Sequence, residues 1–189
     1  MKRVAVFHAT REGQARKVAQ RVAAALVLRE LEVAEHDVGD RDSALALEAA
    51  DAIVIVGSIH LGKHEPELVR FVKEHKAQLD RVPSALLSVQ GAEAGVEAGP
   101  PELRAQAAEH VKQQLEELED QTGWHPRHVR PVAGAFVFTQ YNPLVRWVMK
   151  RIARNEGLST DTSRDHEYTD WLALDDFARQ LAEELHGAA

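Results

Sequence analysis

Hydrophobic positions follow two alternating patterns along the chain. Short runs that are apolar on both faces, such as residues 3–8, 52–58 and 84–90, are typical of strands buried inside a parallel sheet. Between them, apolar residues return every three or four positions, which predicts amphipathic helices. The expected helices cover residues 13–30, 65–79, 102–121, 143–154 and 169–185, and the other expected strands cover 31–37 and 129–138.

This alternation predicts the fold class. Strands of this kind, separated by helices, indicate a parallel sheet that is covered on both sides. Right-handed crossovers then give a doubly wound three-layer α/β sandwich. No repeat, low-complexity tract or linker interrupts the sequence, so we expect one domain over residues 1–189, with 91–101 as a loose loop.

The composition narrows the function classes. The 189 residues are 44% hydrophobic and 28% charged, as in an ordinary globular protein. No apolar run approaches the ~20 residues of a membrane span, and the N-terminus lacks a signal-peptide pattern, so a cytoplasmic location is expected. The absence of cysteine excludes disulfides and thiolate catalysis, and the ten histidines form no metal-binding pattern. A net charge of −7 argues against a nucleic-acid partner.

Charge is distributed unevenly in the second half of the chain. Residues 92–121 are mostly acidic, whereas residues 124–155 include no acidic side chain. The helix expected over 143–154 is apolar on one face and basic on another. Two interpretations fit this pattern. The helix could dock on the sheet with its basic side in solvent, or it could form a surface that binds an anionic substrate or a membrane. The residues of this basic face are Arg146, Trp147, Lys150, Arg151 and Arg154.

The first loop at the ligand-binding end of the expected sheet is suited to a phosphate. Ligands of doubly wound sheets bind beyond the carboxyl ends of the strands. Residues Thr10–Ala15 follow the first strand and lead into a helix, whose unpaired N–H groups and dipole attract anions. Gly13 allows close approach of the backbone. The same residues would also suit a simple capped helix start.

Two further loops offer candidate chemistry. Ser58–Gly62 follows the most apolar strand and includes His60, a candidate proton carrier, although a loop histidine more often packs or forms hydrogen bonds. His64, slightly further on, is expected to be exposed to solvent. Ser88–Gly91 offers a hydroxyl, an amide and a glycine, which could recognise the edge of a heterocycle or satisfy a turn.

Several motifs, in order and over nearly the whole chain, carry a family resemblance. "TREGQA" at 10–15 resembles the Thr-x-Thr-Gly-x-Thr phosphate loop of flavodoxins, with Glu12 and Ala15 in place of hydroxyl residues. "GSIHLGKHEPELVRFVKEH", "VPSALLSV", "VAGAFVF", "STDT" and "YTDW" follow. Together they resemble the flavodoxin-like, menaquinone-dependent protoporphyrinogen oxidases of bacterial haem synthesis.

The resemblance implies a flavodoxin-like fold, with a five-stranded parallel sheet in the order 2-1-3-4-5. It also implies that FMN is the cofactor and that a tetrapyrrole, protoporphyrinogen IX, is oxidised to protoporphyrin IX. Electrons would pass through FMN to a menaquinone-like quinone, and the propionates would meet the basic face. With the chemistry on the flavin, His60 is the remaining catalytic candidate. The expected cofactor residues are Thr10, Arg11, Glu12, Gly13, Gln14, Ala15, Ser58, Ile59, His60, Leu61, Gly62, Ser88, Val89, Gln90, Gly91, Thr160, Asp161 and Thr162.

One departure from the family keeps other functions open. The segment between the fourth and fifth strands is usually basic in these oxidases, whereas here the corresponding variable insert, Ala92–Gln121, is acidic. The rival interpretation is a flavodoxin-like FMN electron carrier or quinone reductase without tetrapyrrole activity. A third is a binding module that has lost its flavin. Peripheral contact with the inner face of the cell membrane and homo-oligomerisation stay open as well.

Overall fold

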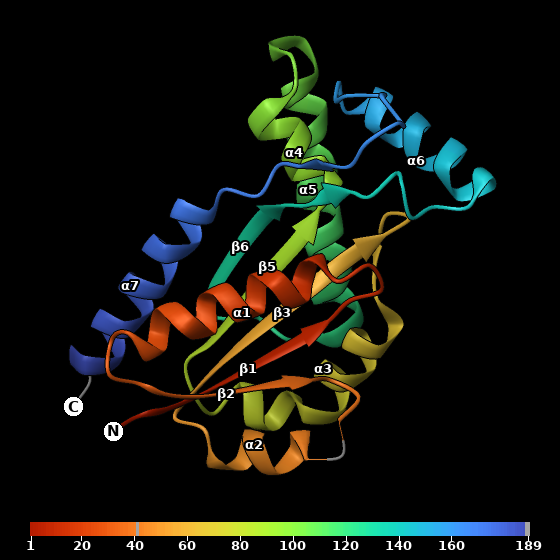
Figure 1. The fold of residues 1–189 in the computed structure, drawn as a ribbon. Helices are drawn as coiled ribbons and strands as arrows, with labels where there is room; N and C mark the ends of the chain where they lie inside the picture. The colour runs from red at the N-terminus through yellow and green to blue at the C-terminus, as the bar shows by residue number, and fades with distance from the viewer. Residues whose placement is uncertain (41, 188–189) are drawn as a thin grey trace.

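The structure is a computed structural model, and it describes residues 1–40 and 42–187. A twisted parallel sheet forms its centre (Figure 1). The parallel strands are β1 (Arg3–Ala9), β2 (Glu32–Asp37), β3 (Ala52–His60), β5 (Ser84–Gln90) and β6 (His128–Ala133), in the order β2-β1-β3-β5-β6. This order confirms the predicted fold class. A sixth strand, β4 (Lys63–His64), pairs antiparallel with the end of β3.

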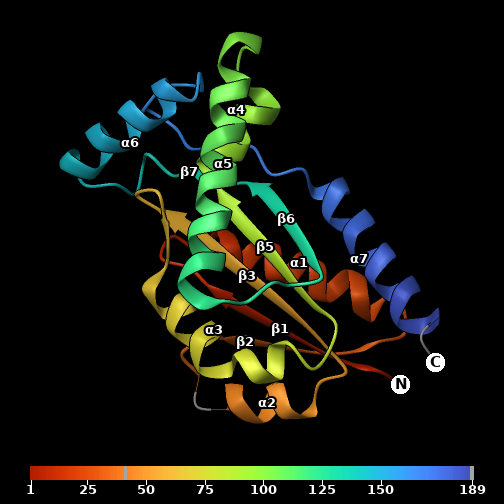
Figure 2. The same cartoon turned by 180° about the vertical axis from the view of Figure 1, so that it is seen from behind.

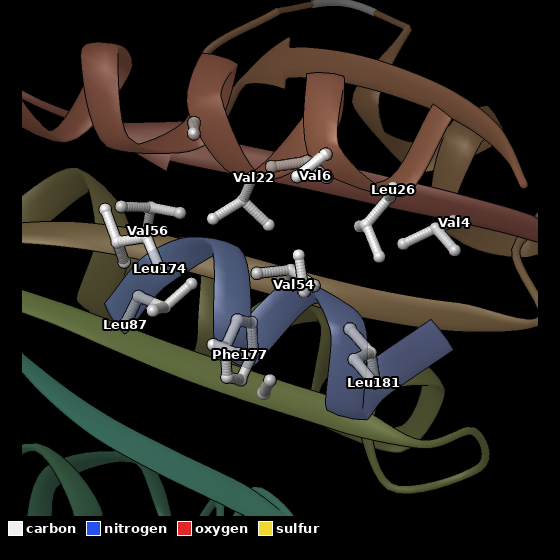
Figure 3. Packing of buried hydrophobic residues seen from close by; sticks show 14 of the residues in the cluster. Val4, Val6, Val22, Leu26, Val54, Val56, Leu87, Leu174, Phe177 and Leu181 are labelled. Carbon is white, nitrogen blue, oxygen red and sulfur yellow. The ribbon is translucent and has the colours of Figure 1, made fainter. Parts of the chain in front are cut away.

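Helices cover both faces of the sheet (Figures 1 and 2). Helices α1 (Gln14–Val27) and α7 (Trp171–Gly187) pack on one face. Helices α2 (Ser43–Ala49) and α3 (Pro66–Leu79), with the C-terminal part of α5 (Pro101–Thr122), pack on the other. Figure 3 shows the first of these two layers, where side chains of α1 and α7 meet those of the strands.

The alternation of side chains along each strand builds these two layers. In β3, Val54 and Val56 face α1 and α7, whereas Ile53 and Ile55 face the opposite helices. Each fully buried aliphatic side chain of this size contributes about 1.5–3 kcal/mol to folding. A strand buried on both faces therefore needs the continuous apolar run that the sequence has at these positions.

A smaller hydrophobic cluster lies beyond the carboxyl ends of the strands. It joins α4 (Gly91–Ala98) and α6 (Pro143–Asn155) to the short antiparallel pair of β7 (Ala135–Phe136) and β8 (His166–Glu167). Stacked or edge-on rings hold it together, with ring centroids 5.9–6.3 Å apart. These rings belong to Phe136, Phe138, Tyr141 and Tyr168.

Three sequence expectations are corrected here. The segment 91–101 is not a loose loop, because Gly91–Ala98 forms helix α4. Helix α2 was not expected at all, and the strand expected over 129–138 is broken at Gly134. Close packing explains why the helix contains glycine at position 95, because an added Cβ at Gly95 would lie 2.9 Å from the Glu156 Oε2 atom.

Within residues 1–40 and 42–187, no helix combines the length and the apolar content that crossing a membrane would require.

Candidate functional site

A narrow cleft of about 100 Å³ lies at the carboxyl ends of β1, β3 and β5. This is the edge where the winding of the sheet reverses between β1 and β3, the usual place for a ligand in such folds. The cleft brings together the three loops that the sequence singled out. The predicted residues that line it are Thr10, Arg11, Glu12, Gln14, Ser58, Ile59, His60, Leu61, Gly62, Val89, Gln90 and Gly91.

The other predicted cofactor residues lie outside the lining of the cleft. Ala15 packs in the core beneath the first turn of α1, and Ser88 is fully buried in β5. The segment Thr160–Thr162, between α6 and β8, forms a turn in which the backbone N–H and the hydroxyl of Ser163 donate to Asp161 Oδ1. Its closure over a flavin therefore stays a prediction.

Gly13 shapes the first loop. Its φ of 88° lies in the left-handed region, and it immediately precedes the first turn of α1. Its backbone N–H donates to Thr10 Oγ1 at 2.9 Å, so the loop folds tightly around the start of the helix. The first-turn N–H groups of α1 have no acceptor within the helix, which leaves them available to an anion.

Glu12 occupies a hydroxyl position of the flavodoxin loop, and the structure gives its carboxylate two partners. The Tyr141 hydroxyl donates to Glu12 Oε2 at 2.8 Å, and His60 Nδ1 lies 3.7 Å from Glu12 Oε1. Burial raises the pKa of Tyr141 above its usual range, and the negative charge of Glu12 raises it further. Tyr141 therefore stays protonated and holds the carboxylate.

Gln90 provides the polar group at the inner end of the cleft. It is only 1% exposed, and in the described residues neither its amide nitrogen nor its amide oxygen has a hydrogen-bond partner. An unsatisfied buried amide costs about 1–3 kcal/mol per group, so both atoms favour a ligand that carries a donor and an acceptor. Gly91 follows, where an added Cβ would lie 3.0 Å from Phe136 Cζ.

The expectation that His64 is exposed is wrong. The antiparallel pairing of β4 with β3, with His64 opposite Ile59, turns this side chain inward, and the residue is only 7% exposed. Its Nε2 lies 3.0 Å from Ser88 Oγ, and burial lowers its pKa to about 4. His64 is therefore neutral at pH 7, and its contact with Ser88 joins β4 to β5.

The "YTDW" motif packs against the first loop at the start of α1. The Gln14 Nε2 group donates to Thr169 Oγ1 at 2.8 Å, and the Thr169 hydroxyl donates to the Ala133 carbonyl at 2.7 Å. The start of α7 is thereby tied to both α1 and β6. The sequence identified the motif but offered no signal of this contact.

Sequence reasoning missed part of the cleft lining. The lining residues that were not predicted belong to segments whose periodicity indicated only packing, so nothing in the sequence distinguished them from ordinary core or surface positions. They are Glu65, Ala92, Gln114, Gly134, Ala135, Phe136, Met149, Ile152 and Glu156.

The residues of the basic face of α6 differ in their contacts and in their exposure to solvent. The Arg146 guanidinium donates to the carbonyls of Phe138 (2.9 Å) and Tyr141 (3.0 Å), so this residue braces the preceding turn. Trp147 is 61% exposed and Leu144 is 72% exposed. Arg151 and Arg154 are exposed, and Lys150 is partly exposed.

The strand order, with a polar cleft after β1 and β3, defines a flavodoxin-like α/β protein. A family model described as "Flavodoxin domain" matches residues 5–163, and the chain therefore belongs to the flavodoxin family. Protoporphyrinogen IX dehydrogenase [quinone] from Escherichia coli (strain K12) is 31% identical over 179 residues, which are 94% of this chain and 93% of that protein. The Leishmania major protein of the same name is 26% identical over 77% of this chain and 59% of its own length.

Solved structures with this fold include two flavodoxins. One, a short-chain flavodoxin associated with a non-canonical PDU bacterial microcompartment, has a TM-score of 0.55 at 15% identity, and the match covers 97% of this chain and 99% of that one. A flavodoxin from the domain Archaea has a TM-score of 0.54 at 14% identity, with the same coverage. Both likenesses concern the fold.

Membership of this family identifies FMN as the cofactor, and the cleft fits it in two respects. The left-handed Gly13 and the free first-turn amides of α1 form a cradle for a phosphate. The unpartnered amide of Gln90 matches the alternating donors and acceptors at the edge of a flavin ring. The Glu12 carboxylate is engaged by Tyr141, so it leaves the backbone of the loop to hold the anion.

Proposed function

We propose that this protein is an FMN-dependent oxidoreductase that oxidises protoporphyrinogen IX to protoporphyrin IX and passes the electrons to a quinone. The observation that carries the proposal is the 31% identity to the E. coli protein named protoporphyrinogen IX dehydrogenase [quinone], over 94% of this chain. The polar cleft at the switch point of the sheet supports it, because it offers the groups that FMN needs.

Different loops of the cleft bind different parts of FMN. The Thr10 hydroxyl and the backbone of Glu12–Ala15 bind the phosphate. The ring lies between Ser58–Gly62 and Val89–Gly91, where Gln90 meets its polar edge. Gly13 maintains the shape of the first loop, and Thr160–Thr162 remain candidates to cover the ring.

The reaction has a defined balance of electrons and protons. Conversion of protoporphyrinogen IX to protoporphyrin IX removes six electrons and six protons, so three quinones are reduced to three quinols. Bound FMN supplies the two-electron redox chemistry that a chain without cysteine cannot supply itself. His60 is the side-chain candidate to accept a proton, because its imidazole lines the cleft, where its Nδ1 lies 3.7 Å from Glu12 Oε1.

The test is an anaerobic assay. FMN-loaded protein is mixed with protoporphyrinogen IX and a menaquinone analogue, and porphyrin fluorescence is followed against a control without protein. A rise that depends on both protein and quinone is the expected result. If FMN is bound and fluorescence does not rise above the control, the oxidase proposal is wrong.

The rival function is an FMN electron carrier or quinone reductase without tetrapyrrole activity. The observation that favours it is the acidic surface of α5, which would repel an anionic tetrapyrrole and attract a basic redox partner. Quinone reduction with an artificial electron donor, together with no activity on protoporphyrinogen IX, would support this function. The exposed acidic residues on α5 include Glu102, Glu109, Glu116 and Asp120.

We also propose that α6 touches an anionic membrane surface, where a lipid-soluble quinone would be found. Leu144 and Trp147 present exposed apolar surface on this helix, and Arg151 and Arg154 present positive charge. An amphipathic helix with these features suits an interfacial position rather than a span. Cosedimentation with phosphatidylglycerol vesicles tests this proposal.

A further inference from the structure

A second and much larger cavity lies beside the flavin cleft. It is a groove of about 710 Å³ between α3 and α5, which is within the ~300–1,000 Å³ range of small-molecule sites. In Figure 2 these two helices lie on the same face of the sheet. The groove and the cleft share a wall, because five residues line both. These residues are Arg11, His60, Leu61, Glu65 and Gln114.

The shared wall contains two buried acceptors without partners. Glu65 is 5% exposed, and its Oε2 receives a hydrogen bond from the Arg11 guanidinium at 2.9 Å. Among the residues that the structure describes, nothing donates to Glu65 Oε1 or to Gln114 Oε1. Buried acceptors rarely stay unpaired in a native protein. This wall therefore favours a ligand that brings N–H or O–H donors.

The α3 side of the groove carries two unpaired cations. Arg70 and Lys73 are exposed, lie one helical turn apart, and form no ion pair within the described part of the chain. Lys63 and Arg11, by contrast, are engaged by Glu117 and Glu65. Two free cations at this spacing match two carboxylates of one ligand. The floor is apolar, and the groove lining also includes Glu74.

We infer that this groove binds the tetrapyrrole, with pyrrole N–H groups at Glu65 and Gln114 and the two propionates at Arg70 and Lys73. The inference rests on the proposed function and deepens it, because it gives the substrate a site next to the flavin instead of on α6. A quinone fits the groove poorly, since its carbonyls are acceptors and it has no anionic group. Only a ligand with both donors and carboxylates satisfies the wall and the cations together.

The test measures binding of the stable product, protoporphyrin IX, to FMN-loaded protein by fluorescence titration in a nonionic detergent. The double variant Arg70→Glu/Lys73→Glu is expected to lower porphyrin affinity at least tenfold and to leave FMN affinity unchanged, because neither residue lines the cleft. The control, Lys76→Glu/Lys112→Glu, reverses the same number of cations outside the groove, one on α3 and one on α5, and its porphyrin affinity should equal that of wild type.

Two further measurements separate the contacts. Protoporphyrin IX dimethyl ester has no free carboxylate, so the Arg70→Glu/Lys73→Glu variant should bind it as wild type does. Glu65→Gln should weaken binding of both the acid and the ester several-fold, because it puts an amide N–H where a pyrrole N–H needs an acceptor.

The outcomes distinguish the inference from the proposed function. If wild-type protein oxidises protoporphyrinogen IX but the groove and control variants bind porphyrin equally well, the groove assignment is overturned and the function stands. If FMN-loaded wild type neither oxidises the substrate nor binds porphyrin, the proposed function fails and this inference fails with it.

Discussion

Gly13 is the single residue that we expect to have the largest effect on cofactor binding. Its φ is 88°, and an added Cβ would meet no atom within 4 Å, so the need for glycine is conformational rather than steric. A β-branched residue in the left-handed region is strained by about 1–3 kcal/mol. Gly13→Val is expected to relieve this strain by reshaping the loop, and to lower FMN affinity at least tenfold. Fluorescence titration with FMN measures the change.

The control is Gly123, which ends α5 at the opposite end of the sheet with a φ of 65°. Gly123→Val has comparable strain and should lower the melting temperature to a similar degree, while FMN affinity stays at the wild-type value. Equal FMN affinity in the Gly13 and Gly123 variants would contradict the assignment of the phosphate loop.

His64 makes stability depend on pH. In the folded protein its pKa is lowered to about 4, whereas the unfolded chain has the ordinary value of about 6.5. Between these values the unfolded state binds the proton and the folded state does not, so stability falls as the pH drops from 6.5 towards 4. From pH 7.5 to 4.5, wild type should lose about 2–3 kcal/mol more than His64→Gln.

Urea denaturation at both pH values measures this difference. The variant controls for carboxylates and other histidines, because these titrate in both proteins. Parallel pH profiles for wild type and His64→Gln would show that His64 is not buried as described.

The site residues that the sequence revealed are those with a local chemical reason. Gly13 lies in the loop after β1 and Gln90 is the last residue of β5, so both lie at the strand ends where the ligand-binding rule for such sheets predicted a site. Glu65 directly precedes α3 and Gln114 lies in α5, and the two meet only through tertiary packing, so no local pattern could pair them. The inward orientation of His64 depends on a two-residue strand that is too short to leave a periodic signal.

At the scale of elements, α6 is the helix least integrated into the core. Of its residues only Ala153 is fully buried, although its apolar and basic faces are well separated. Near an anionic surface each basic residue contributes about 1 kcal/mol to binding. Lys150→Glu/Arg151→Glu/Arg154→Glu should therefore lower affinity for phosphatidylglycerol vesicles by roughly 100-fold, measured by cosedimentation.

Arg146 is left intact in this variant because it braces the turn before α6. The control reverses Lys76, Arg81 and Lys112, none of which belongs to α6, and should leave vesicle binding close to that of wild type. If the wild-type protein does not bind anionic vesicles, or if both triple variants lose vesicle affinity to the same degree, α6 is not the element that contacts the membrane.

Elements were predictable where one face is clearly apolar. The strands β1, β2, β3 and β5 and the helices α1, α3, α5 and α7 have the expected periods, and their bounds agree with the predictions to within a few residues. Helix α4 was predicted to be a loop because the segment is rich in glycine and ends in two prolines, whereas Gly91 and Gly95 are explained by side chains packed against them. Helix α2 has only seven residues, too few to show a period.

At the scale of the whole molecule, the order of the sheet was predictable but the position of the second cavity was not. Strand order follows from alternating strands and helices and from the resemblance to flavodoxins. The groove depends on how far α3 and α5 stand apart at their ends, which is set by side chains from both helices and by β4. Helices α4 and α5, which span most of the acidic segment 92–121, both supply residues to the cleft, and α5 also supplies residues to the groove.

Because the cleft joins loops from three central strands, binding of FMN should stabilise the entire fold. A ligand that binds only the folded state at 100 times its dissociation constant adds about 2.7 kcal/mol, which for this chain length raises the melting temperature by about 5–10 °C. At the same concentration, riboflavin should add much less, because it has no phosphate to occupy the start of α1. In Gly13→Val the advantage of FMN over riboflavin should disappear. Differential scanning calorimetry with each flavin measures all three effects, and equal stabilisation of wild type by FMN and riboflavin would show that the first loop does not bind phosphate.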